Sequence, residues 1–148
     1  MQRHLESVGG QLLADSTATK DPVDFVRKLL ELRAHYQRIV SDAFHGSREM
    51  DRAMRDSFEK FLNVDHRCAQ FLSLYVDAEL RTGFRGRTSD EIDHALNCVI
   101  LLFRYLRDKD VFETFYKQHL QKRLLGGRSA SDEAERMMIA KLKSECGY

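Results

Sequence analysis

Apolar residues recur at every third or fourth position along most of this 148-residue chain, and this spacing constrains the fold more than any other feature. Such spacing gathers the apolar side chains on one face of an α-helix. No stretch alternates between apolar and polar residues as a half-buried strand does. Pro22 is the single proline, so long stretches contain no helix breaker. We therefore predict an all-α protein with about seven helices.

The first breaks divide the N-terminal half into helices. Gly9-Gly10 interrupts the first apolar stripe, so we expect a short or frayed helix within residues 1–14, weakened by about 1 kcal/mol per glycine. Asp21-Pro22 supplies a cap followed by proline at the first helical position, which predicts a helix running to about Phe44. His45-Gly46 ends that helix.

Further caps and glycines organise the rest of the chain. Ser47 is expected to cap the third helix, and Gly83 is expected to end the fourth as a left-handed C′ residue. Thr88 and Glu91 have the spacing of a capping box and precede the most apolar helix, which we place at the centre of the fold. A helix beginning after residue 108 ends at Gly126-Gly127. Ser129 and Ser131 offer caps for a last helix, which Gly147 stops.

The amino-acid composition indicates an ordered protein with little net charge. Basic residues number 24 and acidic residues 23, so no global field attracts nucleic acid or an anionic membrane. The longest apolar run, residues 98–103, is too short to cross a bilayer, and the N-terminus lacks the apolar segment of a secretion signal. Cys68, Cys98 and Cys146 are widely spaced and odd in number, which favours free thiols in a reducing compartment.

Enzymatic and metal-binding interpretations have little support in the sequence. His94 and Cys98 lie four apart on one predicted helix, a spacing compatible with zinc, but the tighter paired spacings of structural zinc sites are missing. A thiol hydrolase would need a base beside a cysteine, and no nucleophile motif surrounds any of the three. The acidic pair Asp108 and Asp110 lies at a helix start, where capping explains it. We expect no cofactor, no metal and no catalytic residue.

Two features raise the question of nucleic acid. Residues 83–86 match the G-x-x-G of a KH loop, but a KH domain needs strands. The second feature is a basic group on and after one predicted helix: Lys117, His119, Lys122, Arg123 and Arg128. A solvated helix face is the simplest interpretation of this group, and an electrostatic dock for an acidic protein tail or a phosphate backbone is the alternative.

Three blocks of sequence resemble the cullin family, in the order in which that family has them. They are residues 20–32 (KDPVDFVRKLLEL) with 58–63 (FEKFLN), residues 71–86 (FLSLYVDAELRTGFRG), and residues 101–147, which include DKDVFETFYKQHLQKRLL and SASDEAERMMIAKLKSECG. Among cullins, the sequence of these blocks is most similar to the subgroup that recruits substrates through BTB-domain adaptors. Cullins are helical scaffolds of multisubunit ubiquitin ligases.

The resemblance implies a non-catalytic scaffold segment in ubiquitin-dependent protein degradation, located in the cytoplasm and nucleus. Residues 1–64 would end a helical repeat, and residues 65–148 would begin a four-helix bundle, so the chain would be a fragment of a complete cullin. The complete cullin would bind a BTB-type adaptor, a RING-box protein and, through it, a ubiquitin-conjugating enzyme. The alternative is a free-standing helical interaction module, which would compete with a complete cullin.

Two sets of residues become site candidates. A basic surface that receives the acidic tail of the conjugating enzyme would include Lys117, Lys122 and Arg123. A packing seam between the repeat and the bundle would be formed by one apolar face: Val111, Phe112, Phe115, Tyr116, Leu120 and Leu124.

Overall fold

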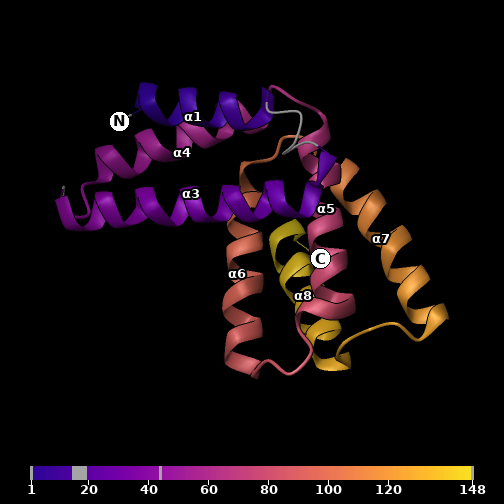
Figure 1. Ribbon diagram of the computed structural model, residues 1–148. Helices are drawn as coiled ribbons and strands as arrows, with labels where there is room; N and C mark the ends of the chain where they lie inside the picture. Colours follow the sequence, from indigo (N-terminus) through magenta and orange to yellow (C-terminus); the bar gives the residue numbers. More distant parts are fainter. Residues whose placement is uncertain (1, 15–19, 44, 148) are drawn as a thin grey trace.

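The computed structural model describes residues 2–14, 20–43 and 45–147, and every regular element in these ranges is helical (Figure 1). The helices are α1 (Gln2–Ala14), α3 (Pro22–Ala43), α4 (Arg48–Leu62), α5 (Arg67–Ala78), α6 (Ser89–Tyr105), α7 (Lys109–Gly126) and α8 (Asp132–Cys146), and a π-helical turn, η1 (Glu79–Gly83), follows α5. The prediction of an all-α protein with about seven helices is confirmed. Within the described ranges, no helix combines the length and apolar character needed to cross a bilayer.

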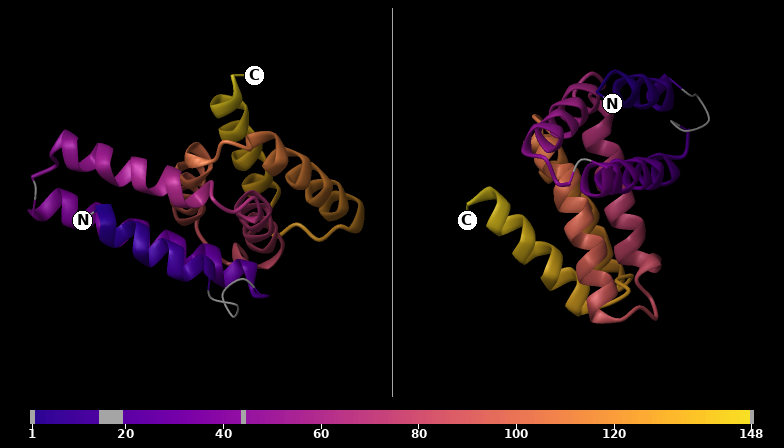
Figure 2. Two further views of the ribbon diagram at one scale, coloured as in Figure 1. Left: turned by 90° about the horizontal axis from the view of Figure 1, so that it is seen from above. Right: turned by 90° about the vertical axis from the view of Figure 1, so that its left-hand side faces the viewer.

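The helices form two groups that cross each other. Helices α1, α3 and α4 run side by side, and α5 to α8 run across them (Figures 1 and 2). Within the groups α1 packs on α4, α5 on α7 and α6 on α8, and α3 packs on α5 to join the groups. The chain changes direction between Leu62 and Arg67, at the place where the sequence predicts a boundary. The assignment of the two groups to a repeat and a bundle stays a prediction.

A single apolar core runs through both groups and is built around aromatic rings. The ring of Phe58 in α4 stacks on Tyr105 at the end of α6, with centroids 5.4 Å apart. Phe25 in α3 meets the ring of Phe71 in α5 edge-on at 5.5 Å. Both contacts join residues of different groups, so the core itself holds the groups together.

A helix lies within residues 1–14 as predicted, but the expected weakening at its two glycines does not interrupt it. Helix α1 runs without a break through Gly9-Gly10, because Gly9 is buried where α1 approaches α4. A Cβ atom at Gly9 would lie 2.7 Å from the ring of Phe61, closer than two packed carbons allow. The missing side chain at this position therefore permits helix packing, which offsets its cost in helix propensity.

The predicted caps are partly confirmed. Thr88 and Glu91 form the capping box, with the Glu91 amide donating to the Thr88 hydroxyl at 3.2 Å. The amide of Asp24 donates to the Asp21 carboxylate at 3.2 Å, and α3 begins with proline as expected. The hydroxyl of Ser131 accepts from the amide of Ala134 at the start of α8.

Other expected caps are not made. Ser47 precedes α4 but makes no side-chain capping bond. Ser129 donates its hydroxyl to Glu135 instead of capping α8. Gly83 does not adopt a left-handed conformation and lies at the end of η1, where a Cβ would come within 2.7 Å of the Glu79 carboxylate. The absence of a side chain at Gly83 thus leaves room for the side chain of Glu79.

Asn63 connects the two groups through its side chain. Its amide nitrogen donates to the carbonyl oxygens of Glu59 at 2.6 Å and Tyr105 at 2.8 Å. Its carbonyl oxygen accepts from the backbone amide of Arg107 at 2.8 Å. One side chain thereby satisfies three backbone groups, at the end of α4 and between α6 and α7. These bonds connect the two groups of helices at the point where the groups cross.

Candidate docking surface

Helix α7 carries most of the residues that the sequence singles out, and the structure divides them between two environments. Phe112 and Tyr116 are buried, and their rings stack with centroids 6.0 Å apart. Val111, Phe115 and Leu120 are half-buried.

Leu124 does not belong to the predicted packing seam, because 58% of its surface is exposed. Helix α7 also packs mainly on α5, within its own group. The contacts between the groups are made by α3 and α4 with α5 and α6. The apolar stripe of α7 therefore ends before its last turn and does not form the seam between the groups.

Arg123 is not part of a basic surface, because only 1% of it is exposed. Its guanidinium donates to Glu135 of α8 from Nε at 2.7 Å and from Nη2 at 3.0 Å. Nη1 donates to Asp77 of α5 at 2.7 Å. This forked arrangement uses the planar geometry of arginine, which lysine lacks. One buried cation thus ties three helices, and we call Asp77, Arg123 and Glu135 the buried ion triad.

Further bonds surround the buried ion triad. Burial alone would lower the pKa of Arg123, but the hydrogen bonds to Glu135 and Asp77 outweigh it and raise this pKa, so the guanidinium stays charged. The Nε of Arg81 lies 3.0 Å from the second oxygen of Asp77. The backbone amide of Ala130 donates to the carbonyl of Leu80 at 2.7 Å. The connection between α7 and α8 is therefore fastened to the end of α5.

A Schellman motif shapes the start of that connection. Gly127 has a φ of 61°, and its amide donates to the carbonyl of Leu124 at 3.4 Å. The amide of Arg128 donates to the carbonyl of Arg123 at 3.0 Å. This pair of bonds turns the chain back over the last turn of α7. Arg128 consequently lies beside the buried ion triad.

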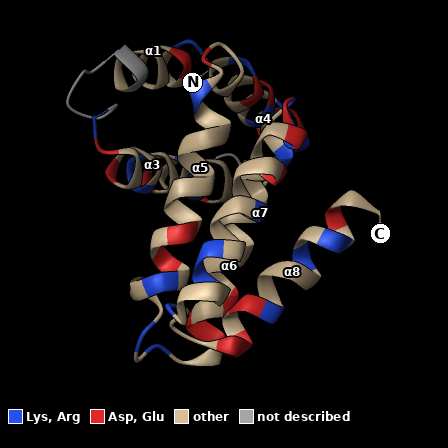
Figure 3. Ribbon diagram, turned by 90° about the vertical axis from the view of Figure 1, so that its right-hand side faces the viewer, with Lys and Arg blue, Asp and Glu red and all other residues tan. Residues whose placement is uncertain are grey.

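Lys117 and Lys122 are exposed, as a docking surface requires, but they line different hollows. Lys122 lines a pocket of about 100 Å³ above the buried ion triad, together with Arg81, His119 and Arg128. Lys117 lines an apolar groove of about 310 Å³ between α7 and α8. Acidic and basic positions lie close together where α5 ends and α8 begins, and the start of α8 itself is acidic (Figure 3). The predicted basic surface is thus reduced to two separate lysines.

The groove between α7 and α8 is mostly apolar and also contains a tyrosine hydroxyl and a cysteine thiol. Its walls are formed by one face of each helix: Glu113, Tyr116, Lys117, Leu120, Ile139, Leu142, Lys143 and Cys146. The hydroxyl of Tyr116 is buried without a hydrogen-bond partner among the described residues, and burial raises the pKa of Tyr116. The thiol of Cys146 donates to Glu113 at 2.9 Å, a bond that raises the pKa of Cys146 to about 11. This thiol stays protonated at neutral pH and makes a poor nucleophile.

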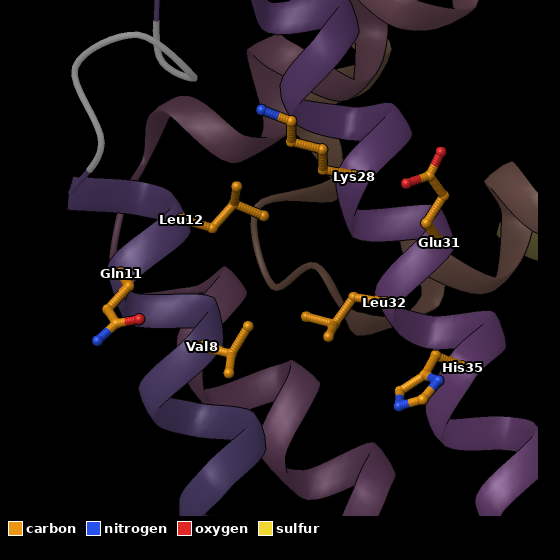
Figure 4. Close-up of a pocket in the computed structure, with 7 residues that line it drawn as sticks. All are labelled: Val8, Gln11, Leu12, Lys28, Glu31, Leu32 and His35. Carbon is orange, nitrogen blue, oxygen red and sulfur yellow. The ribbon is translucent and has the colours of Figure 1, made fainter.

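A second groove separates α1 from α3 and has a volume of about 470 Å³. Leu12 from α1 and Leu32 from α3 face each other across it (Figure 4). Gln11, Glu31 and His35 lie along its rim. Lys28 also lines the groove, which therefore has an apolar centre and a polar, partly charged edge.

The two residues of the candidate zinc pair lie close together. The Nε2 of His94 lies 3.8 Å from the Sγ of Cys98. Across residues 2–14, 20–43 and 45–147, no set of three or more His, Cys, Asp or Glu side chains is placed to hold a metal ion.

Comparisons with known proteins agree along the whole chain. The family model of the cullin α-solenoid domain matches residues 1–148. Cullin-3B and Cullin-3A of Arabidopsis thaliana are each 49% identical to the chain over 148 residues, all of this chain and 20% of each relative. Cullin-3 of Dictyostelium discoideum is 39% identical over 145 residues, 98% of this chain and 19% of the relative. The chain thus spans about a fifth of the length of these curated relatives.

Proposed function

Because this chain belongs to the cullin family, we propose that it serves as a non-catalytic scaffold segment of a cullin–RING ubiquitin ligase. The observation that carries the proposal is the match of all 148 residues to the family, with 49% identity to two relatives. In this role the segment joins the arm that holds the substrate adaptor to the body that holds the RING-box protein. Residues 1–64 form the end of the arm, and residues 65–148 form the start of the body.

The proposed partners are proteins, and they act through the complete ligase. Similarity to several Cullin-3 proteins favours a BTB-domain adaptor on the substrate side. A RING-box protein and a ubiquitin-conjugating enzyme occupy the other side. We place this assembly in the cytoplasm and nucleus.

The physical task of the segment is to keep two distant partners at a fixed separation. A reaction between positioned groups gains rate because their relative freedom is removed before the reaction. Two features of the chain support such stiffness: the Asn63 bonds at the crossing of the helix groups and the buried ion triad between α5, α7 and α8. Neither feature performs chemistry, and both resist bending.

The exposed lysines of α7 supply the second element of the proposal. Lys117 and Lys122 are the members of the predicted basic surface that solvent reaches, and they contribute to attracting the acidic tail of the conjugating enzyme. Arg123 supports this surface from below, since it holds α7 against α5 and α8. Electrostatic attraction of this kind acts mainly on the association rate and weakens with salt.

A segment exchange tests the scaffold role. The 148 residues replace the matching segment of Arabidopsis Cullin-3B, and the chimera is assayed for adaptor binding, RING-box binding and ubiquitin transfer. We expect all three to be retained, because the helices that set the separation are homologous. A chimera that folds and binds both partners but transfers no ubiquitin would contradict the proposal. A chimera in which Asn63 is replaced by Leu should keep binding and lose transfer, which separates geometry from assembly.

A further inference from the structure

The pocket of about 100 Å³ above the buried ion triad has the charge of an anion site. Arg81, Lys122 and Arg128 line it on the outside, and Asp77 and Arg123 form its inner end. The two oxygens of Asp77 are already occupied, one by Arg123 at 2.7 Å and the other by Arg81 at 3.0 Å. Each oxygen of the Asp77 carboxylate therefore already faces an arginine.

Two of the lining cations have no counter-ion. Among the described residues, the side chains of Lys122 and Arg128 make no ion pair or hydrogen bond, and both are exposed. Arg81 contacts Asp77 through its Nε, and a guanidinium has five N–H donors, more than this one contact uses. Within the pocket and the buried ion triad, four cationic side chains face two carboxylates. The pocket consequently has an excess of two positive charges.

The volume of the pocket selects the kind of anion. About 100 Å³ corresponds to roughly three water molecules at about 30 Å³ each. Pockets for drug-sized ligands measure about 300–1,000 Å³, so a nucleotide or a folded peptide does not fit inside. Arginine and lysine side chains together suit an oxyanion with several acceptor oxygens. We propose that this pocket binds a phosphoryl group, held by Arg81, Lys122 and Arg128.

The backbone brings these three residues together from separate parts of the chain. Arg81 lies in the π-helical turn after α5, Lys122 lies in the last turns of α7, and Arg128 is the last residue of the Schellman motif. The buried ion triad and the Ala130–Leu80 bond hold these segments in place before any ligand arrives. A preformed site avoids the cost of ordering its parts on binding.

His119 offers an independent readout of binding. Burial lowers the pKa of His119, Asp77 raises it, and Arg123, Lys122 and Arg81 lower it further. Its Nδ1 lies 3.9 Å from the Asp77 carboxylate, and its Nε2 is buried without a hydrogen-bond partner among the residues that the structure describes. A phosphoryl dianion beside these cations offsets their effect, so binding raises the pKa of His119.

Free phosphate and a phosphorylated side chain of a partner protein present the same chemistry. The proposal goes beyond the scaffold role and does not depend on it. The test titrates the 148-residue chain with inorganic phosphate, with a short phosphoserine peptide, and with the same peptide unphosphorylated, at constant ionic strength. Calorimetry gives the affinity, and the ring resonances of His119 give its pKa.

Charge-removing variants of exposed residues localise the binding. Lys122→Ala and Arg128→Ala should each weaken phosphate or phosphopeptide binding about tenfold, as expected for losing a charged hydrogen-bond donor. Lys117→Ala is the matched control on the same helix outside the pocket and should leave binding unchanged. All three variants should melt as the unaltered chain does, because their side chains are exposed.

The outcomes separate the sources and test the site. Tighter binding of the phosphopeptide than of phosphate identifies a modified protein as the ligand, and equal binding identifies the free ion; both support the pocket. No saturable binding of either ligand, an unchanged His119 pKa, or equal weakening by Lys117→Ala would overturn the proposal. The segment exchange with Cullin-3B can fail without affecting these results, so the two proposals are tested separately.

Discussion

Replacing Arg123 by methionine provides the sharpest test of how the helices are held together. The guanidinium is 1% exposed and donates three hydrogen bonds to two carboxylates. Methionine leaves Asp77 and Glu135 as buried charges without their shared partner. Breaking a buried pair in this way costs about 3–5 kcal/mol. A domain of this kind has a total stability of about 5–15 kcal/mol, so the loss is a large fraction of it.

The assay is thermal and urea unfolding followed by circular dichroism at pH 7. For 150–250 residues, each kcal/mol shifts the melting temperature by about 2–4 °C, so we expect Arg123→Met to lower it by about 6–20 °C. Lys122→Met, one residue away on the exposed face, is the matched control and should change stability by less than about 0.5 kcal/mol. Equal effects of the two substitutions would refute the reasoning.

A third variant tests whether the cost comes from unpaired charge. Replacing Arg123, Asp77 and Glu135 together by methionine or leucine removes every member of the buried ion triad. Apolar replacement of a whole buried ion group is often neutral or stabilising by about 1–4 kcal/mol. The triple variant should therefore be more stable than Arg123→Met alone. If it is equally unstable, lost packing and not unpaired charge explains the single substitution.

Three further predictions concern local features. Gly9→Ala should destabilise the chain by about 1–3 kcal/mol through the clash with Phe61, whereas Gly10→Ala, with nothing within 4 Å, should gain about 1 kcal/mol in urea unfolding. Equal effects would disprove close packing of α1. Thr88→Ala should cost about 1 kcal/mol, measured the same way, since the capping box loses its acceptor; an unchanged midpoint would contradict this. Burial raises the pKa of Cys68 to about 12, so at pH 8 the thiol stays protonated and should resist a disulfide reagent until the chain unfolds. Rapid labelling of Cys68 under native conditions would argue against this.

Local motifs made much of the helical architecture predictable. The capping box at Thr88 and the proline start of α3 involve residues within four positions of each other, and both are confirmed. The same local reasoning was wrong at Gly9, because Phe61, which needs the space, lies 52 positions away. Gly83 differs from the prediction for a local reason, because its missing Cβ leaves room for the carboxylate of Glu79, four positions earlier.

The candidate site was less predictable, because it depends on contacts between distant residues. Arg123 belongs to a basic segment in the sequence, and nothing local distinguishes it from the exposed Lys122. Its partners Asp77 and Glu135 lie 46 and 12 positions away, so its burial follows from the packing of α5 and α8. Leu124 continues the apolar spacing of α7, but 58% of it stays exposed. Periodicity identifies a face, and the neighbouring helices decide how far that face is covered.

Asn63 helps to fix the angle between the two helix groups. The side chain bonds to both helix groups at their crossing, so it acts on the angle between them and not on either group alone. In an elongated molecule, the displacement produced by an angular change grows with distance from the hinge. A misplacement of about 1 Å at reacting groups can cost about a hundredfold in rate. The three hydrogen bonds of Asn63 can therefore affect how accurately distant reacting groups are positioned, although Asn63 does not contact those groups.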